Sequence, residues 1–376
     1  MKIIFTGGGS GGHFYPLIAI AKELNRISHE ERLIAPQLFF MAPEPYNRGL
    51  LFEAGITYLP ISAGKLRRYF SLRNLSDLLK TGWGILNALF IVFRIFPDVV
   101  VGKGGFGSFP ALLAARLFGI PVLIHESDAT PGRVNAWAGK FARRIAVSFK
   151  EAGEFFPPAR VAQTGNPIRP ELLLPASAAG ERFLAAFSRQ PLIFVLGGSL
   201  GSVTLNEALF KILPDLLASY AVVHQAGVNN VADIAARAAI ALSSHPNRDH
   251  YRPIGYLSTA EMAAAGQRAA LIISRAGSTL FEIAAWGKPS ILVPITDSNG
   301  DHQRANAYAY ALGGAAAVIE EANLTPAILK SEIERILGDA ARSDTMSAAA
   351  RNFAKVDAAE IIAREIITLA LKHESV

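Results

Sequence analysis

The chain of 376 residues contains no cysteine, comparatively few charges and no long apolar run. Without cysteine, disulfides, zinc–thiolate sites, iron–sulfur clusters and a cysteine nucleophile are excluded, which fits a reducing compartment. Charged residues make up 18% of the chain against 51% hydrophobic residues, so the chain can bury a large core and is not globally disordered.

Signals for secretion and for membrane crossing are also missing. The apolar run at residues 2–6 is too short for the core of a signal peptide. Residues 83–96 form the longest apolar stretch, 14 residues interrupted by Asn87 and Arg94, whereas a spanning helix needs about 20. We therefore expect a cytoplasmic chain without a transmembrane helix. The net charge of +6 favours contact with phosphates, polyanions or an anionic membrane surface.

Short β-branched runs alternate with helical patterns along most of the chain, which predicts parallel sheets covered by helices on both faces. The rhythm breaks at residues 166–190, where prolines and small residues gather. We therefore predict an α/β protein with two Rossmann-like domains, residues 1–165 and 166–340, and a helical tail, residues 341–376, that either caps the second domain or returns to the first. The predicted strands are residues 2–6, 38–42, 56–61, 98–103, 121–126, 145–149, 160–165, 192–196, 221–225, 251–257, 271–274, 290–295 and 315–319.

Three glycine-rich loops each follow a predicted strand and precede a predicted helix. They are the first glycine loop (residues 7–13, with Ser10, Gly11 and Gly12), the second (residues 102–108, with Gly104 and Gly105) and the third (residues 197–202, with Gly198 and Ser199). Glycine lets the backbone approach a ligand closely, and a helix start offers free N–H groups to an anion. Ligands in open α/β sheets bind at this edge.

The first glycine loop also matches the dinucleotide fingerprint Gly-x-Gly-x-x-Gly. A nicotinamide enzyme of that type has an acidic residue about 20 residues further on. Here the nearest acid after the second strand is Glu44, 32 residues beyond Gly12. The sequence therefore disfavours an NAD(P) oxidoreductase, and no cofactor is expected.

The order of motifs resembles the MurG family of glycosyltransferases, in the GT-B class. The matching segments are residues 7–16, 102–107, 125–126, 164–169, 197–199, 224–225, 274–282 and 301–306. The resemblance implies two domains facing a cleft and an inverting transfer of N-acetylglucosamine from UDP-GlcNAc to the C4 hydroxyl of the MurNAc unit of lipid I. Lipid II, the peptidoglycan precursor, would be the product, formed by a peripheral protein on the cytoplasmic side of the plasma membrane, with no nucleic-acid partner.

The sequence departs from the family pattern at three places. His125-Glu126 is followed by Ser127-Asp128 where the family has glutamine and asparagine, so an amide that contacts the donor becomes a carboxylate. Leu200 replaces a common glutamine, and the segment from residue 277 to residue 282 is one residue shorter. These departures affect the expected details of sugar recognition.

The expected chemistry requires a stabilised UDP leaving group and a base for the acceptor hydroxyl. No Asp-x-Asp pair occurs, so we expect no metal at the pyrophosphate and assign the charge to backbone N–H groups, Ser199 and Arg169. His13, at a helix start, and Glu126, at a strand end, are the alternative bases.

The resemblance also places the donor on the second domain. Glu282 would bind the ribose diol, Gln303 the sugar, and the backbone near Leu257 the uracil. Gly198 and three further positions complete the expected substrate contacts: Ser278, Thr279 and Asn306.

A segment of the first domain has the composition of an interfacial helix region. Lys65, Arg67, Arg68 and Arg73 precede Trp83, Ile85 and Leu86. Cations for anionic head groups followed by apolar side chains favour binding to an anionic membrane surface.

Two further functions remain open on the sequence. Another GT-B enzyme, either a lipid glucosyltransferase or a UDP-GlcNAc epimerase, would share the glycine loops. A non-catalytic nucleotide-sugar binding protein would bind UDP-GlcNAc without turnover.

Overall fold

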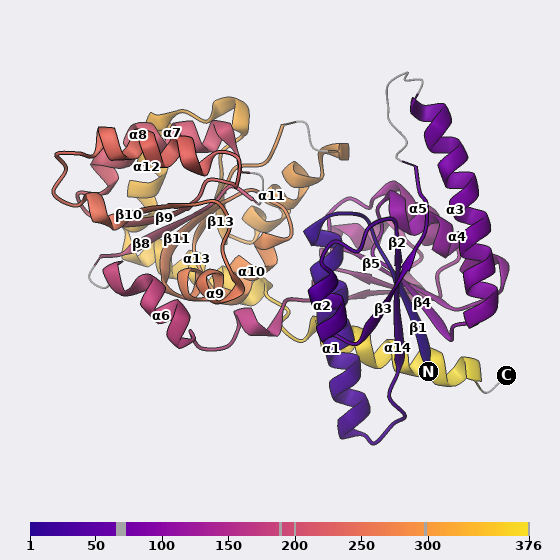
Figure 1. Ribbon diagram of the computed structural model, residues 1–376. Coiled ribbons are helices and arrows are strands. Elements are labelled where there is room, and N and C mark those ends of the chain that lie inside the picture. Colours follow the sequence, from indigo (N-terminus) through magenta and orange to yellow (C-terminus); the bar gives the residue numbers. More distant parts are fainter. Residues whose placement is uncertain (65–72, 188–189, 199–200, 297–298, 375–376) are drawn as a thin grey trace. The chain divides into compact units, whose positions relative to one another are not determined.

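The computed structural model describes residues 1–64, 73–187, 190–198, 201–296 and 299–374. The chain divides into two compact units (Figure 1). The first unit comprises Met1–Arg169 and Lys355–Val376, and the second comprises Pro170–Ala354. Each contains one parallel sheet with helices on both faces, in agreement with the predicted fold class.

The first unit is built on a seven-stranded sheet in the order β3-β2-β1-β4-β5-β6-β7, and every pair is parallel. Its strands are β1 (Lys2–Thr6), β2 (Gln37–Ala42), β3 (Ile56–Pro60), β4 (Val99–Gly102), β5 (Val122–Glu126), β6 (Arg144–Val147) and β7 (Val161–Gln163). Its helices are α1 (Gly11–Glu30), α2 (Arg48–Glu53), α3 (Arg73–Ile95), α4 (Phe109–Leu117), α5 (Arg133–Ala138) and α14 (Ala358–Glu374).

The alternation of side chains along each strand decides which helices cover which face. Ile3 and Phe5 of β1 join a buried cluster with α1, α2 and α14. Ile4, between them, joins the cluster on the opposite face with α3, α4 and α5. Because both faces are covered, the strands are apolar throughout, which explains their continuous hydrophobic runs in the sequence.

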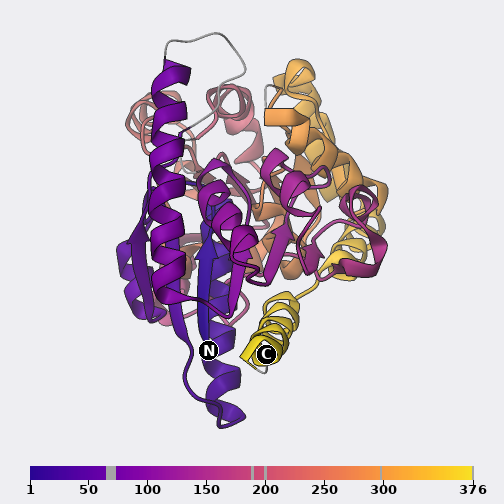
Figure 2. The ribbon, with the colours of Figure 1, turned by 90° about the vertical axis from the view of Figure 1, so that its right-hand side faces the viewer.

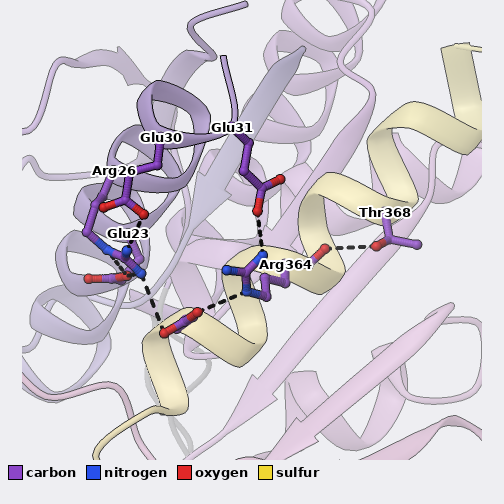
Figure 3. Close-up of polar contacts among 7 residues, drawn as sticks. Glu23, Arg26, Glu30, Glu31, Arg364 and Thr368 are labelled. Carbon is purple, nitrogen blue, oxygen red and sulfur yellow. Dashed lines mark hydrogen bonds and ion pairs between the residues drawn. The ribbon is translucent and has the colours of Figure 1, made fainter. Parts of the chain in front are cut away.

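The C-terminal helix α14 belongs to the first unit, although it follows the second unit in the chain. Ile362 and Ile366 are buried against α1 and the sheet. Figure 3 shows the polar contacts at the rim, where Arg364 contacts Glu31 at 2.7 Å and Arg26 contacts Glu360 at 3.5 Å. Exposed ion pairs contribute about 0–1 kcal/mol each, so the apolar contacts do most to hold the helix.

The second unit has a six-stranded parallel sheet in the order β10-β9-β8-β11-β12-β13. Its strands are β8 (Leu192–Leu196), β9 (Ala221–Gln225), β10 (Tyr251–Ile254), β11 (Ala269–Ser274), β12 (Ser290–Leu292) and β13 (Ala316–Val318). Its helices are α6 (Ala178–Leu184), α7 (Val203–Leu216), α8 (Val231–Ala241), α9 (Thr259–Arg268), α10 (Thr279–Trp286), α11 (His302–Leu312), α12 (Pro326–Leu337) and α13 (Ala340–Phe353). α13 packs on α10, whereas α14 packs on α1.

Helix α3 is longer than the apolar run in the sequence indicated. Its residues Asp77–Ile95 are long and apolar enough to cross a membrane by length and composition, with a hydropathy of 1.4 and 17% of the window buried. Yet α3 is also the crossover between β3 and β4, and Ala88 and Val92 are fully buried in the core. In Figure 2 it stands upright beside the sheet of its unit. Packing on the sheet accounts for the apolar residues of one face only, because most of this window is exposed.

Candidate functional site

In both sheets the strand order reverses beside the first strand of the unit. In the first unit the chain runs outward from β1 through β2 in one direction and from β4 in the other. In the second unit the same reversal lies between β8 and β11. The carboxyl ends of strands at such a reversal are the usual ligand site of open α/β sheets. All three glycine loops follow these strands, the first after β1, the second after β4 and the third after β8.

The first and second glycine loops touch each other, backbone to backbone. A Cβ atom on Gly105 would lie 2.7 Å from the Cα atom of Gly8, and Gly105 has a φ of +78°. Gly104, with a φ of +84°, leaves similarly little room before Asn135. Glycine is therefore required at both positions: a side chain on Gly105 would separate the loops, and one on Gly104 would collide with Asn135.

His13 lies where these two loops meet, in the first turn of α1. Its Nδ1 atom lies 2.6 Å from the Oγ atom of Ser10, the residue that precedes the helix. This contact fixes the plane of the ring and leaves Nε2 on the side of Gly105. A histidine oriented in this way has the geometry of a general base or acid.

The carboxylate of Glu126 is buried and engaged by three donors. Its Oε1 atom accepts the backbone N–H of Asp128 at 3.0 Å, and its Oε2 atom accepts the N–H of Gly132 at 3.0 Å and Nδ2 of Asn135 at 2.9 Å. Burial raises the pKa of this carboxyl, and the negative charge of Asp128 raises it further. The arrangement secures the loop between β5 and α5.

Lys103, in the second glycine loop directly after β4, and His125, on the neighbouring strand β5, are both fully buried. Burial lowers the pKa of Lys103 to about 8, while the charges of Glu126 and Asp128 act in the opposite direction. The pKa of His125 lies well below its usual range because of burial and the charge of Lys103. His125 Nε2 lies 2.9 Å from the carbonyl oxygen of Gly165, so the neutral ring donates there.

Arg169, predicted to contact phosphate, is the last residue of the first unit. Its guanidinium carbon lies 4.4 Å from the centre of the Tyr15 ring, and Tyr15 belongs to the first turns of α1. The structure therefore places this cation close to the first glycine loop, where the helix start also favours an anion.

The third glycine loop leads into α7. A Cβ atom on Gly201 would lie 1.9 Å from the carbonyl oxygen of Ala226, and both Gly198 and Gly201 have positive φ values. Ser202 caps α7 by accepting the N–H of Leu205 at 3.2 Å. Ser199, the predicted phosphate contact in this loop, lies outside the described residues, as does Leu200.

Arg275 links four loops at the carboxyl edge of the second sheet. It donates to the carbonyl oxygen of Val293 at 2.9 Å, to the hydroxyl of Ser202 and to the carboxylate of Glu321. Glu321 in turn accepts the N–H and hydroxyl of Thr296, each at 3.3 Å. Burial acts to raise the pKa of Glu321, but the hydrogen bonds and charge of Arg275 outweigh it and lower this pKa.

The predicted donor-binding residues follow strands of the same sheet. Ser278 precedes α10, Thr279 is its first residue, and Glu282 lies in its first turn. These side chains are partly exposed after the carboxyl end of β11.

The other residues predicted to bind the donor are Gln303, Asn306 and Leu257, and they differ in burial and in their hydrogen bonds. Gln303 accepts the backbone N–H of Ile295 at 3.2 Å. Asn306 is 1% exposed and donates to the carbonyl oxygen of Ala276 at 3.1 Å, so it supports the loop before α10. Leu257 has a buried side chain in the core.

No sequence pattern pointed to Lys103 or Asn135, and Arg275 lies within the family motif at residues 274–282. The position of Lys103 inside a glycine-rich loop is the one sequence feature that could have pointed to this residue. Its burial, however, depends on the packing of neighbouring strands. Among the described residues, no group of three or more histidine, aspartate or glutamate side chains could hold a metal ion.

Family models match both halves of the chain. Residues 3–147 match the glycosyltransferase family 28 N-terminal domain, and residues 192–362 match the glycosyltransferase family 28 C-terminal domain. The strand-order reversals beside β1 and β8, with their glycine loops, lie within or at the edge of these matches.

Individual relatives agree with the family models. The chain is 36% identical over 338 residues to a UDP-N-acetylglucosamine–N-acetylmuramyl-(pentapeptide) pyrophosphoryl-undecaprenol N-acetylglucosamine transferase 2 of Bacillus cereus, covering 89% of this chain and 91% of the relative. The crystal structure of Acinetobacter baumannii MurG superposes with a TM-score of 0.75 at 27% identity, over 98% of this chain and 99% of that one.

A Neisseria meningitidis UDP-GlcNAc 2-epimerase, solved with UDP-GlcNAc, also superposes, with a TM-score of 0.69 at 15% identity. The match covers 98% of this chain and 100% of the epimerase, and at this identity it shows a shared fold only. The extensive identity to the Bacillus transferase and the matches to both domain models go beyond fold. The chain belongs to the MurG family of glycosyltransferases.

Proposed function

We propose that this glycosyltransferase moves N-acetylglucosamine from UDP-GlcNAc to the C4 hydroxyl of the MurNAc unit of lipid I, giving lipid II. The observation that carries the proposal is 36% identity over 89% of the chain to a relative whose name describes that transfer. The two sheet edges support it, because each unit places glycine loops at a strand-order reversal.

Transfer of radiolabel from UDP-GlcNAc to a lipid I analogue tests this function directly. The expected result is a labelled lipid product whose formation requires both substrates. Conversion of UDP-GlcNAc alone to an epimer would identify an epimerase instead. Binding of UDP-GlcNAc without turnover on any acceptor would identify a binding protein.

The donor is assigned to the second unit, with Glu282 on the ribose diol. A partly exposed carboxylate at the start of α10 can accept two hydrogen bonds from adjacent hydroxyls. Glu282→Ala should raise the donor KM by the equivalent of about 1–3 kcal/mol, the usual cost of a lost charged hydrogen bond. An unchanged donor KM would remove the ribose assignment.

His13 is the better base of the two candidates. Its ring is oriented by Ser10 beside the second glycine loop, whereas both oxygens of Glu126 are already engaged by donors. A base needs a lone pair within reach of the acceptor hydroxyl. We therefore assign proton removal to His13 and the positioning of the loop after β5 to Glu126.

The leaving UDP is assigned to helix starts and cations without a metal. The chain lacks an Asp-x-Asp pair, and Arg169 lies beside Tyr15 near the start of α1. Backbone N–H groups at glycine loops stabilise developing negative charge in the same way. Turnover should therefore persist in a chelator, and its loss with the fold intact would show that a divalent ion takes part.

Helix α3 is assigned to an anionic membrane surface on the cytoplasmic side. One stripe of its exposed face is apolar, formed by Leu79, Trp83, Leu86, Phe90 and Phe93, each more than 60% exposed. These positions recur at intervals of three and four residues, which aligns them along one side of the helix. Ile85 is only half-buried and lies off this stripe.

The cations predicted to accompany this stripe are not part of the described side chains. Lys65, Arg67 and Arg68 lie outside the described residues, and only the backbone of Arg73 is described. Replacing the four cations with glutamine should weaken salt-sensitive binding to anionic vesicles, at about 1 kcal/mol each. Transfer to a lipid-embedded acceptor should slow, and transfer to a short-chain analogue should not. Equal losses on both acceptors would contradict the membrane role.

A further inference from the structure

Buried polar atoms without a partner gather at the carboxyl edge of the first sheet. They are Thr6 Oγ1, Lys103 Nζ, His125 Nδ1, Asn135 Oδ1 and Asn166 Oδ1, all lacking a hydrogen-bond partner among the described residues. Most buried polar groups in proteins are paired, so a cluster of unpaired ones indicates a functional role for this edge of the sheet. Lys103 is the most costly of them, because it can carry a full charge.

The carboxylates that act on Lys103 both come from the end of β5 and the loop after it. Lys103 follows β4, and the β4–β5 register sets Gly102 opposite Ile124, so Lys103 falls opposite His125. The negative charges of Glu126 and Asp128 favour its protonated form. His125 is the other titratable neighbour, and its neutral ring adds no charge. The buried edge thus has one ammonium ion for two carboxylates.

Asp128 is the unusual member of this group. The resemblance in the sequence has an amide at this position, which would need no counter-charge. A carboxylate two residues after Glu126 adds a second negative charge near a buried one, and the charge of Lys103 in the facing loop acts on both without a direct hydrogen bond. Like charges in a low-dielectric setting are costly unless they are compensated.

We propose that Lys103 is a positioning residue, the buried counter-charge of Asp128 and Glu126, which holds the loop after β5 so that Asp128 presents a carboxylate to a donating hydroxyl or amide N–H of the substrate. The inference rests on the proposed function, which supplies a sugar substrate rich in such donors. A carboxylate only accepts hydrogen bonds, so the Lys103–Asp128 pair makes this side of the site selective for donors.

A double-mutant cycle of Lys103→Met and Asp128→Asn tests the pairing. Methionine replaces the buried stem without charge, and asparagine replaces the carboxylate with a group of equal size. Thermal unfolding is measured without substrate, and kcat and KM are measured for both substrates. Lys288→Met, which removes a partly buried lysine from the second unit, is the matched control.

If the pairing holds, Lys103→Met lowers kcat/KM at least tenfold, and adding Asp128→Asn to it causes little further loss, because Lys103 acts through Asp128. The changes in unfolding midpoint are non-additive as well, and Lys288→Met leaves kcat/KM within about twofold. The activity of the parent chain falls above about pH 8 as Lys103 loses its proton, and the double variant lacks this fall.

Independent, multiplicative losses in the two single variants would overturn the inference, and so would unfolding midpoints that simply add. The thermal cycle needs no activity, so a parent chain that transfers no sugar would remove the proposed function while leaving the pairing tested. Coupling in stability without coupling in kcat/KM would reduce Lys103 to a structural residue and overturn its positioning role.

Discussion

The loops at the carboxyl edges of the two sheets are held together by different kinds of contact. In the second unit Arg275 joins loops through hydrogen bonds to Ser202, Val293 and Glu321, although its Nε atom has no partner among the described residues. In the first unit glycine backbones touch directly, and Lys103 is buried without a hydrogen-bond partner. Side-chain hydrogen bonds across an edge hold its loops before a ligand binds, whereas the several unpaired polar atoms of the first edge can still form hydrogen bonds with a ligand. This contrast suits the donor site proposed for the second unit and the acceptor site proposed for the first.

The sharpest test of the contrast is His13→Ala, because it removes the proposed base from the first unit alone. We expect kcat to fall by about 10²–10⁴, the usual share of a general base, with UDP binding to the second unit nearly unchanged. Ser10→Ala should cost less, since it only frees the ring orientation. A collapse of UDP binding in His13→Ala would make this residue a positioning group for the donor.

Arg275→Met should break the paired edge of the second unit. It leaves Glu321, whose side chain is 18% exposed, without its cation. Removing one partner of a buried pair costs about 3–5 kcal/mol in the free energy of unfolding, measured by denaturant titration. Arg335→Gln breaks an ion pair in which the arginine side chain is 52% exposed, so it should cost well under 1 kcal/mol. Similar costs for both variants would refute the contrast.

Lys103 should give the free energy of unfolding a distinctive dependence on pH. Its pKa falls from 10.5 in the unfolded chain to about 8 when buried, so between these values the unfolded chain binds more protons. Stability attributable to this group therefore rises with pH across that window, by about 3 kcal/mol in total, and is lost as pH falls towards 8. Subtracting the free energy of unfolding of Lys103→Met from that of the parent chain at each pH isolates this contribution. A difference that does not change with pH would show that Lys103 has an ordinary pKa.

Gly105→Ala should have the smallest effect on stability and activity among these variants. Its control, Gly9→Ala, makes the same chemical change in the neighbouring glycine loop. The new Cβ atom would lie 2.7 Å from Gly8, at a φ of +78°. Such strain costs about 1–3 kcal/mol and should appear in both stability and kcat/KM. Gly9→Ala, in the first glycine loop, meets nothing within 4 Å and should be nearly silent. Equal effects would mean that the loops do not need to touch.

The strands could be predicted from the sequence because buried parallel strands appear as short, continuous apolar runs. The thirteen predicted strands correspond to β1–β13, and residues 2–6, 192–196 and 221–225 coincide with β1, β8 and β9. The ends differ where a loop takes over: the run at residues 98–103 shortens to β4 because Lys103 already belongs to the glycine loop. Propensity fixes where a strand exists, whereas its last residue depends on the partner strand.

The length of α3 shows the limit of reading composition alone. The sequence separates an apolar run at residues 83–96 from a basic segment before it, and the helix joins Arg73 to Ile95 in one element. The extra turns contact the segment after β3, where the N–H of Gly64 donates to the hydroxyl of Thr81 at 3.0 Å, and such a contact is invisible to a local pattern.

What the sequence determined by itself was local or repeated: two α/β series, glycine loops at strand ends, the Ser10–His13 spacing and the order of family motifs. These depend on periodicity and on neighbours within a few residues. What only the tertiary structure decided was which distant groups meet: Lys103 with Glu126 and Asp128, and Arg275 with Glu321. Their protonation and pairing follow from burial and from charges on other strands, and burial is a property of the packed sheet rather than of any one segment.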